Sequence, residues 1–386
     1  MNPLSRRNPL SRRNFVTGTT AAAGLLAGCA PAAPQARQAA ESRPPSDERL
    51  TGDRLIVLGT SGGPVFHSGR TGIGSALVVN DQLYVVDCGY GTSRQLALAL
   101  GGGPEDSADF SGLRAVFLTH LHSDHVADYF PMLSYGLYHG VGEHPVHVHG
   151  PGRRGPVQPA VAQRTAGEPE PPVVEPDNPV PGTADMTRQL YDAFALDIND
   201  RIRDNGKPDL TRVARAHDIE LPDVPGYEPN TNSAPPMDPF PIWSDANVRV
   251  SAILVMHWPV APAFAFRFDT PKGSVVFSGD TGPSENLVRI AHDCDILVHE
   301  VIDPDYIARS TAGKPNGEAM RKHHATAHTS VDDVGGIAQE AGAKTLVLSH
   351  IVPGNASDEV LSRAQHGFSG ELVIPADRQQ IALPDR

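Results

Sequence analysis

The sequence predicts an α/β fold in which helices cover the outer faces of two packed β-sheets. Apolar runs of strand length are followed by helix-like segments, and this pattern occurs in two halves of the chain, before residue 153 and after residue 245. In both halves several of the apolar runs end in histidine or aspartate. The same pattern that defines the fold therefore also places potential metal ligands at the ends of strands.

The first 28 residues are predicted to be an export signal and not part of the fold. Arg12 and Arg13 precede Phe15 and a short stretch of small apolar residues, which is the arrangement found in signal peptides. The arginine pair resembles a twin-arginine signal. We therefore expect export of the protein across a bacterial membrane.

Cys29 is the predicted point of attachment to that membrane. The residues up to Cys29, Leu-Ala-Gly-Cys, resemble a bacterial lipobox, although a plain signal peptide with a chance cysteine is the alternative. Residues 29–51 are rich in Ala, Pro, Gln and Ser and are predicted to form a flexible tether. Residues 52–386 then form the main domain, held by the lipid at the periplasmic face of the membrane.

The chain is acidic, with 45 Asp and Glu residues against 32 Lys and Arg residues and a net charge of −13. Removal of the signal would take away arginines and no acidic residue, which would make the mature protein more acidic. A strongly acidic surface repels polyanions, so no nucleic acid is expected as a substrate. Cys88 and Cys294 each adjoin an apolar run and are predicted to be buried thiols, with a disulfide between them as the alternative.

The predicted elements follow each other in a similar order in the two halves. In the first half, strands are predicted at 54–59, 75–80, 82–87, 113–118 and 146–149, and helices at 92–100 and 126–138. In the second half, strands are predicted at 248–256, 264–268, 274–277, 296–298 and 345–348, and a helix at 331–341.

The segment between the halves, residues 153–245, has a different composition. It is rich in proline and polar residues, except for a stretch with apolar residues four apart that predicts one amphipathic helix at 186–202. We interpret the segment as an inserted lid, because the apolar stripe needs a surface to cover. A disordered linker is the alternative.

A cluster of metal-ligand residues directly follows the strand at 113–118. His120 and His122 point to one side of an extended chain, and a turn would bring Asp124 and His125 into the same space. Imidazole nitrogen suits a borderline metal such as zinc, and aspartate adds an oxygen ligand. A solvated histidine-rich loop is the alternative, which this spacing after a buried strand disfavours.

Three further ligand-type residues follow strands in the second half. His257 ends the strand at 248–256, Asp280 follows the strand at 274–277, and His350 follows the strand at 345–348. A single histidine at a strand end would be weak support for a metal site. Three such residues in succession make a shared site the better interpretation.

These motifs resemble the metallo-β-lactamase superfamily, and within it the tRNase Z and arylsulfatase-like branch. The resemblance covers roughly residues 52–152 and 247–352. It rests on His-x-His-x-Asp-His at 120–125, Asp-Cys-Gly at 87–89, His-Gly-Pro at 149–151, Ser-Gly-Asp-Thr at 278–281, His-Glu at 299–300, His-Thr-Ser at 328–330 and Ser-His at 349–350. It implies a four-layer αβ/βα sandwich, here with an inserted lid.

The resemblance also implies two zinc ions per chain. His120, His122 and His257 would hold one ion, Asp124, His125 and His350 would hold the other, and Asp280 would bridge them. Two ions could ionise a shared water near neutral pH and stabilise charge on the substrate.

Other residues acquire catalytic roles through the same resemblance. Asp124 would orient the hydroxide, and His328 would protonate the leaving group with Glu300 as its partner. A purely structural His328 is the alternative. Arg70 is a candidate for binding an anionic substrate. Six other histidines are interpreted as surface or packing residues: His139, His144, His147, His149, His323 and His324.

The predicted function is hydrolysis of a small anionic ester, either a phosphodiester or an aryl sulfate ester. Lactonase or β-lactamase-like acyl hydrolysis, and a ribonuclease Z-like phosphodiesterase, are the alternatives. A metal-binding lipoprotein without turnover is a weaker one. The interval between His257 and Asp280 is too short for the arm with which bacterial tRNase Z grips tRNA, and an exported protein would not meet tRNA precursors. The oligomeric state is left open, with a homodimer among the options.

Overall fold

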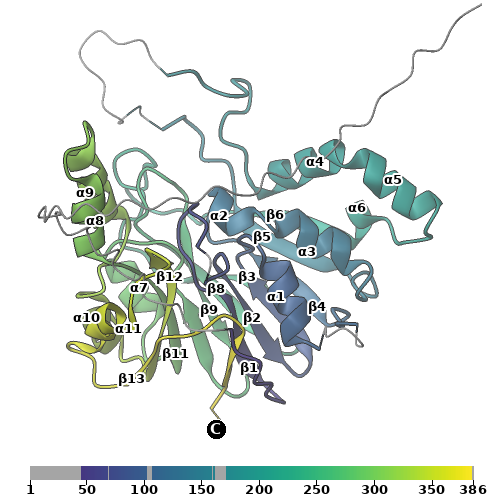
Figure 1. Cartoon of the computed structure of the whole chain (residues 1–386). Helices are drawn as coiled ribbons and strands as arrows, with labels where there is room; N and C mark the ends of the chain where they lie inside the picture. The colour runs from purple at the N-terminus through teal and green to yellow at the C-terminus, as the bar shows by residue number, and fades with distance from the viewer. Residues whose placement is uncertain (1–44, 68, 102–106, 159, 161–170, 385–386) are drawn as a thin grey trace, which may run out of the picture. The chain divides into compact units, whose positions relative to one another are not determined.

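The computed structural model describes residues 45–67, 69–101, 107–158, 160 and 171–384. The chain separates into two compact units, Met1–Gln38 and Ala39–Arg386, and the first lies entirely outside the described residues. The predicted signal peptide and Cys29 fall there as well. The second unit contains all the elements that follow (Figure 1).

The first sheet has seven strands in the order β14-β1-β2-β3-β4-β5-β6. Its first three pairings are antiparallel and its last three are parallel. The strands are β1 (Arg54–Gly59), β2 (Gly74–Val79), β3 (Gln82–Val86), β4 (Leu113–Phe117), β5 (Val146–Pro151), β6 (Ala214–Ile219) and β14 (Gln379–Ala382).

The second sheet also has seven strands, in the order β13-β12-β11-β10-β9-β8-β7. Strands β7 to β10 pair antiparallel, and β10 to β13 pair parallel. The strands are β7 (Phe240–Ser244), β8 (Arg249–Leu254), β9 (Phe264–Asp269), β10 (Ser274–Phe277), β11 (Ile296–Ile302), β12 (Thr345–Val352) and β13 (Glu371–Val373).

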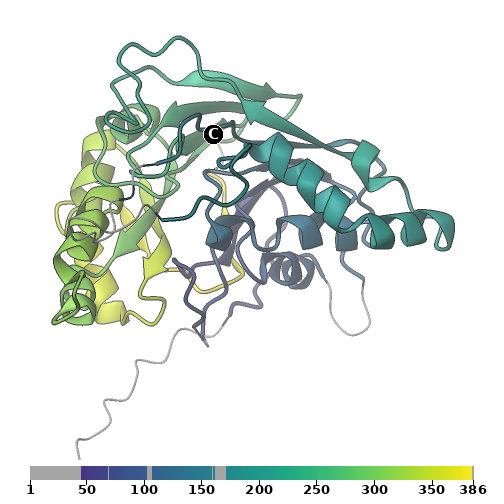
Figure 2. The same cartoon turned by 90° about the horizontal axis from the view of Figure 1, so that it is seen from above.

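Helices cover the outer face of each sheet (Figures 1 and 2). The first sheet carries α1 (Thr92–Ala99), α2 (Ser123–Val126), α3 (Tyr129–Gly136), α4 (Thr183–Ala193), α5 (Ala195–Arg203) and α6 (Leu210–Val213). The second carries α7 (Glu285–Ile290), α8 (Pro304–Thr311), α9 (Gly317–Ala327), α10 (Val334–Ala341), α11 (Asp358–Leu361) and the 3₁₀ helix η1 (Ser362–Gln365). This arrangement is the predicted αβ/βα sandwich, and the fold prediction is confirmed.

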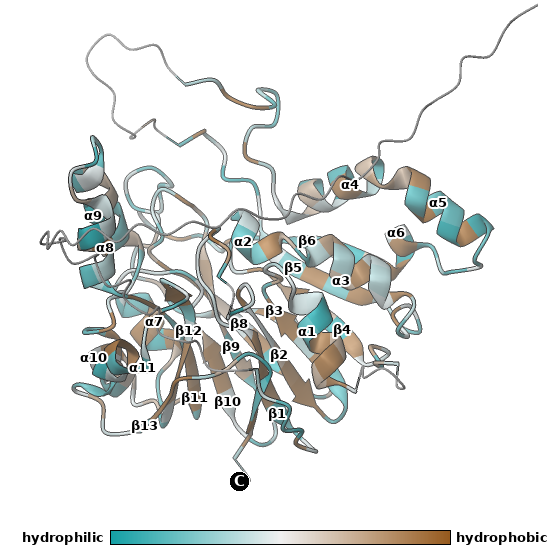
Figure 3. Ribbon diagram, in the orientation of Figure 1, coloured by the Kyte–Doolittle hydropathy of each residue, from teal (hydrophilic) through white to brown (hydrophobic). Residues whose placement is uncertain are grey.

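Alternation along the strands divides the apolar side chains among three layers. One layer lies between the sheets and contains Phe117, Phe264, Phe266 and Phe268. The other two lie between each sheet and its helices. The strands are accordingly the most hydrophobic ribbons (Figure 3). Burial of each such side chain is worth about 1.5–3 kcal/mol relative to exposure, so the packed sheets form a firm base for the loops at their edges.

The predicted lid at 153–245 is only partly correct. Strand β6 extends the first sheet beside β5, and β7 extends the second sheet beside β8. The predicted single helix at 186–202 is two helices, α4 and α5, which meet at Phe194, and residues of both pack against the first sheet. The segment therefore supplies an edge strand to each sheet and helices to one face.

Two smaller observations complete the fold. Cys88 and Cys294 are buried and free, as predicted. Among the described residues, no helix is both long and apolar enough to cross a membrane.

Candidate metal centre

The candidate ligands come together at one edge of the two sheets, although they are far apart in the sequence. His120 follows β4, and the short helix α2 directly after it carries Asp124 and His125. From the second sheet, His257 follows β8, Asp280 follows β10 and His350 lies within β12. The sheets thus position the residues from opposite sides, and short loops complete the arrangement.

Three histidines form the first cluster. His120 Nε2 lies 3.0 Å from His122 Nδ1, and His257 Nε2 lies 3.4 Å from the same atom. His120 and His257 are buried, whereas His122 is exposed. Three imidazole nitrogens in such proximity can bind one metal ion.

Asp124, His125 and His350 form the second cluster. His350 Nε2 lies 3.4 Å from Asp124 Oδ2, and His125 Nε2 lies 3.7 Å from the same oxygen. All three side chains are buried. This cluster combines nitrogen and oxygen donor atoms that lie within 4.8 Å of one another, close enough to hold a metal ion.

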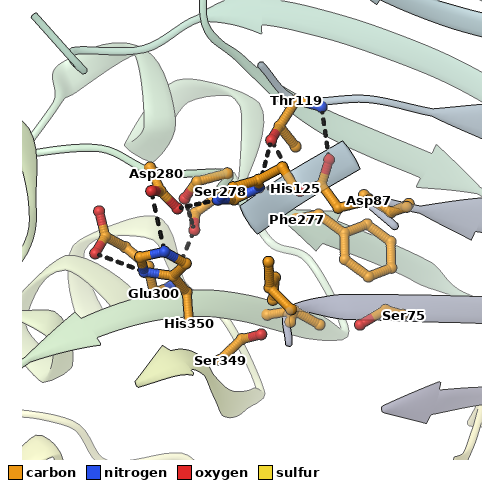
Figure 4. Close-up of a pocket in the computed structure, with 14 residues that line it drawn as sticks. Ser75, Asp87, Thr119, His125, Phe277, Ser278, Asp280, Glu300, Ser349 and His350 are labelled. Atoms are coloured by element: carbon orange, nitrogen blue, oxygen red, sulfur yellow. Dashed lines mark hydrogen bonds and ion pairs between the residues drawn. The ribbon is translucent and has the colours of Figure 1, made fainter. Parts of the chain in front are cut away.

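Asp280 lies between the clusters and approaches both. Its Oδ2 atom is 3.9 Å from the Nε2 atoms of His120 and His257, and 3.2 Å from His350 Nε2. Its Oδ1 atom is 3.4 Å from His125 Nε2. Figure 4 shows Asp280 between His125 and His350, with Glu300 beside them. One carboxylate thus contacts residues of both clusters.

Burial and neighbouring charges shift the pKa values of the site histidines in different directions. Burial lowers the pKa of His257 to about 3 and lowers that of His120 well below its usual value. Burial alone would lower the pKa of His350, but the carboxylates of Asp280, Asp124 and Glu300 together outweigh burial and raise that pKa to about 10. Histidine binds metal in its neutral form, which burial favours at His120 and His257.

Two ligand atoms are left without hydrogen bonds, which tests whether the cluster fits a metal. Asp280 Oδ1 and His125 Nε2 are buried and have no hydrogen-bond partner among the described residues. Unsatisfied polar atoms in the interior are costly, and a cation between them would remove that cost. The donor set of imidazoles and carboxylates therefore fits a borderline metal ion.

A histidine–carboxylate pair borders the clusters. His328, which follows α9, lies with its Nδ1 atom 3.0 Å and 2.9 Å from the two carboxylate oxygens of Glu300. A ring nitrogen of His328 lies within 4.8 Å of ligand atoms of His257 and Asp280. Burial lowers the pKa of His328, but Glu300 outweighs it and raises this pKa. The pair thus holds a proton next to the clusters.

Comparison with known proteins supports the assignment of the fold. The family model described as "Metallo-beta-lactamase superfamily" matches residues 69–193, which include the ligands of α2 and the strand before it. In addition, the short form of human tRNase Z has a similar structure, with a TM-score of 0.54, 17% sequence identity, and coverage of 86% of this chain and 99% of that one. Over residues 69–193 the chain is thus similar in sequence to the metallo-β-lactamase superfamily, and its two-sheet architecture is consistent with the metallo-β-lactamase fold.

Two further comparisons extend this result. The metallo-β-lactamase fold protein YhfI from Bacillus subtilis superposes with a TM-score of 0.52 and 18% identity, covering 86% of this chain and 100% of that one. Ribonuclease Z of Mycobacterium bovis BCG Pasteur is 29% identical over 336 residues, which are 86% of this chain and 99% of the relative. Ribonuclease Z of Mycobacterium tuberculosis H37Rv is 28% identical, with 86% and 98% covered.

The names of these relatives bear on which of the predicted functions is better supported. They favour the ribonuclease Z-like alternative over the small-ester prediction. They also conflict with the prediction that no nucleic acid is bound, because these two mycobacterial relatives, which match over nearly their whole length, are named ribonuclease Z. Net charge was the main basis for that prediction, and it describes the whole chain rather than the surface around the site.

Arg70, the predicted substrate-binding residue, is buried and hydrogen-bonded within the fold. Only 4% of its surface is exposed, and its Nη1 atom donates to Thr60 Oγ1 at 2.7 Å and to the Pro375 carbonyl at 3.0 Å. These contacts join loops within the superfamily fold. The structure therefore does not support the predicted binding of a substrate by Arg70.

Asp87 is a residue of the site to which the sequence analysis gave no role. Its Oδ2 atom lies 2.8 Å from His125 Nδ1, and its carboxylate accepts hydrogen bonds from the backbone N–H and hydroxyl of Thr119. Such a partner orients the imidazole and directs Nε2 toward the cluster. Its position directly after β3 was the available signal, since other strands also end in site residues.

The backbone at Asp280 depends on the glycine before it. Gly279 adopts a φ of +58°, and a Cβ atom there would lie 2.6 Å from the Phe264 carbonyl oxygen. Only glycine fits such close contact in the left-handed region without strain. The Ser-Gly-Asp-Thr motif thus has a steric basis as well as a chemical one.

Proposed function

We propose that this protein is a metal-dependent phosphodiesterase of the ribonuclease Z type. The observation that carries the proposal is the contact of Asp280 with two three-residue clusters, next to the His328–Glu300 pair. The relatives named ribonuclease Z favour a phosphodiester of RNA as the bond that is cleaved.

The proposed metals are two zinc ions. His120, His122 and His257 would bind one ion, Asp124, His125 and His350 the other, and Asp280 both. When bound, such a pair lowers the pKa of water and offsets the negative charge of a phosphoryl group.

The chain's own residues would manage the protons. Asp124 lies at the second cluster, where its carboxylate can accept a hydrogen bond from the attacking water and orient it. His328 can donate a proton to the leaving oxygen, since Glu300 favours its protonated form. Glu300 also accepts a hydrogen bond from the Thr281 backbone N–H at 2.6 Å, which fixes its carboxylate.

The proposal is tested with zinc-loaded protein and two substrates, a short RNA with a 3′ extension and bis-p-nitrophenyl phosphate. We expect hydrolysis of both, with the higher kcat/KM for RNA, and loss of both activities in Asp280→Ala. Turnover of the small diester alone would refute the assignment to RNA. Absence of hydrolysis of either substrate by fully metallated protein would refute the phosphodiesterase.

A small anionic ester is the second candidate, and one observation favours it. The interval between His257 and Asp280 is filled by β9 and β10, which pair with each other in the second sheet and leave no room for a protruding arm. Rates on p-nitrophenyl sulfate and on a lactone, measured beside those on the diester, separate sulfatase and acyl hydrolase activity from phosphodiesterase activity.

We also propose that the protein is exported by the twin-arginine route and carries a lipid on Cys29. The support is the sequence alone, through Arg12, Arg13 and the lipobox-like residues before the cysteine. Cys29→Ser should release the protein from the membrane fraction of a bacterial host. Equal membrane association of both forms would refute lipidation.

A further inference from the structure

A group of histidines outside the candidate metal centre lies on two neighbouring strands of the first sheet. His147 and His149 are two residues apart in β5, and His217 of β6 pairs in register with His149. Side chains at such positions share one face of a sheet. Here it is the face toward the second sheet, because the Phe117 ring stacks on His149 at 5.5 Å and Trp243 of β7 lies 5.4 Å from the same ring.

The three imidazoles are close enough to bind one ion together. His147 Nδ1 lies 3.0 Å from His217 Nε2, and one ring nitrogen from each histidine lies within 4.8 Å of the others. The rings are nearly parallel, with interplanar angles of 12–17° between His217 and its two neighbours. Rotation about χ2, which is soft for histidine, can aim the nitrogens at one point.

His149 provides a second, independent observation. It is only 9% exposed, and its Nε2 atom has no hydrogen-bond partner among the described residues. A buried polar atom without a hydrogen bond costs free energy, which a bound ion would offset. Burial, and after it the neighbouring His217 and His147, lower the pKa of His149 to about 3, so the ring is neutral and able to coordinate a metal.

We propose that His147, His149 and His217 form a binding site for a late first-row divalent metal ion such as Zn²⁺, Ni²⁺ or Cu²⁺. Three imidazoles without a carboxylate in the group suit these metals and disfavour Mg²⁺ and Ca²⁺, which prefer oxygen ligands. The site is separate from the candidate metal centre, because its residues belong to β5 and β6 and share no ligand with either cluster.

The ion can reach this site from solvent. His147 and Trp243 line a surface pocket together with Arg114, His144 and Asp245. A bound ion would join β5 to the edge strand β6 and would lie beside Trp243 of the second sheet. Binding to the folded state alone would therefore raise the Tm in proportion to the logarithm of metal concentration.

Trp243 makes the site measurable by fluorescence. The chain has two tryptophans, and the other, Trp258, adjoins the ligand His257, so Trp258→Phe leaves Trp243 as the only reporter. The Trp243 ring lies 4.8 Å from the His147 ring, so Cu²⁺ bound at the histidines would quench the fluorescence of Trp243. We expect saturable quenching in Trp258→Phe, competition by Zn²⁺, and no effect of Mg²⁺.

Matched variants in the same background decide the assignment. His217→Ala and His149→Ala should each weaken the quenching by about tenfold or more, whereas His144→Ala, in the same pocket but outside the cluster, should leave it unchanged. Equal quenching in all of these proteins would overturn the proposal. Failure of Zn²⁺ to compete with Cu²⁺ in Trp258→Phe would also overturn it, and this arm does not depend on whether a histidine variant folds.

Metal content gives a readout that is independent of the catalytic proposal. The parent protein should hold one more zinc ion per chain than His217→Ala, whatever the candidate metal centre contains. Identical zinc contents in folded protein would refute the second site.

Discussion

Asp280 is the residue on which the proposed centre most depends, because its carboxylate approaches both clusters. Asp280→Ala should lose most of the bound metal and nearly all hydrolytic activity. Metal per chain and turnover of bis-p-nitrophenyl phosphate measure this. Asp293→Asn, which changes an exposed acidic residue, should retain both, and an active, metal-replete Asp280→Ala protein would contradict the bridging role.

His328 is predicted to act on the proton and not to hold the metal. His328→Ala should retain the metal content and lower kcat by about 10²–10⁴-fold, the usual contribution of a general acid. Lys322→Ala, an exposed change on α9, is the control. An unchanged kcat, or a loss of metal equal to that of Asp280→Ala, would show that His328 has a different role.

A variant of Asp87 tests whether the hydrogen bond between this carboxylate and His125 strengthens zinc binding. Asp87→Ala removes the carboxylate partner of the Nδ1 atom of His125 and should weaken zinc binding by about 10–100-fold, measured by competition with a chelator. Asp128→Ala is the matched control, because that carboxylate binds Ser93 and no metal ligand. Equal zinc affinity in the two variants would refute this role of Asp87.

At the scale of elements, the layer between the sheets should dominate stability. Phe266 is fully buried there, with its ring 5.7 Å from that of Phe117, and Phe266→Ala should lower the free energy of unfolding by about 3–5 kcal/mol. Leu196 on α5 is 88% exposed, so Leu196→Ala should change the free energy of unfolding by less than about 0.5 kcal/mol. Denaturant unfolding compares the two, and similar losses would contradict the assigned packing.

The sequence predicted those elements that have a strong apolar period. Central strands such as β2, β10 and β11 are buried on both faces, so their runs of apolar residues were visible in the sequence, and the candidate ligands were found at strand ends. Strands β6 and β7 were missed because edge strands with Arg215, His217 and Pro241 resemble polar loop. Strand β14 was missed because its pairing with β1 joins the two ends of the domain.

Side-chain direction was the other limit of sequence analysis. Arg70 was predicted to bind substrate, but it is buried and donates to the Pro375 carbonyl, which lies 305 positions away in the chain. His147 and His149 were predicted to be surface or packing residues, and their neighbour His217 becomes visible only once β6 pairs with β5. The contact of Arg70 with Pro375 and that of His217 with β5 are tertiary contacts that no local pattern encodes.

For the whole molecule, the net charge and the sequence similarity to ribonuclease Z favour different substrates. The net charge of −13 and the proposed export argue against RNA, whereas the similarity to ribonuclease Z extends over nearly the full length of those relatives. The proposed chemistry is common to both candidates, since a phosphodiester of either size needs the same centre. Comparing the rates on RNA and on bis-p-nitrophenyl phosphate therefore shows whether the substrate is large or small. The metal content of the centre needs a separate test.

The most direct test of that centre is anomalous diffraction at the zinc edge from crystals of the zinc-loaded protein. The account predicts two peaks, one beside His120, His122 and His257 and one beside Asp124, His125 and His350, about 3.5–4 Å apart with Asp280 contacting both. A single peak, or two peaks that Asp280 does not join, would contradict it.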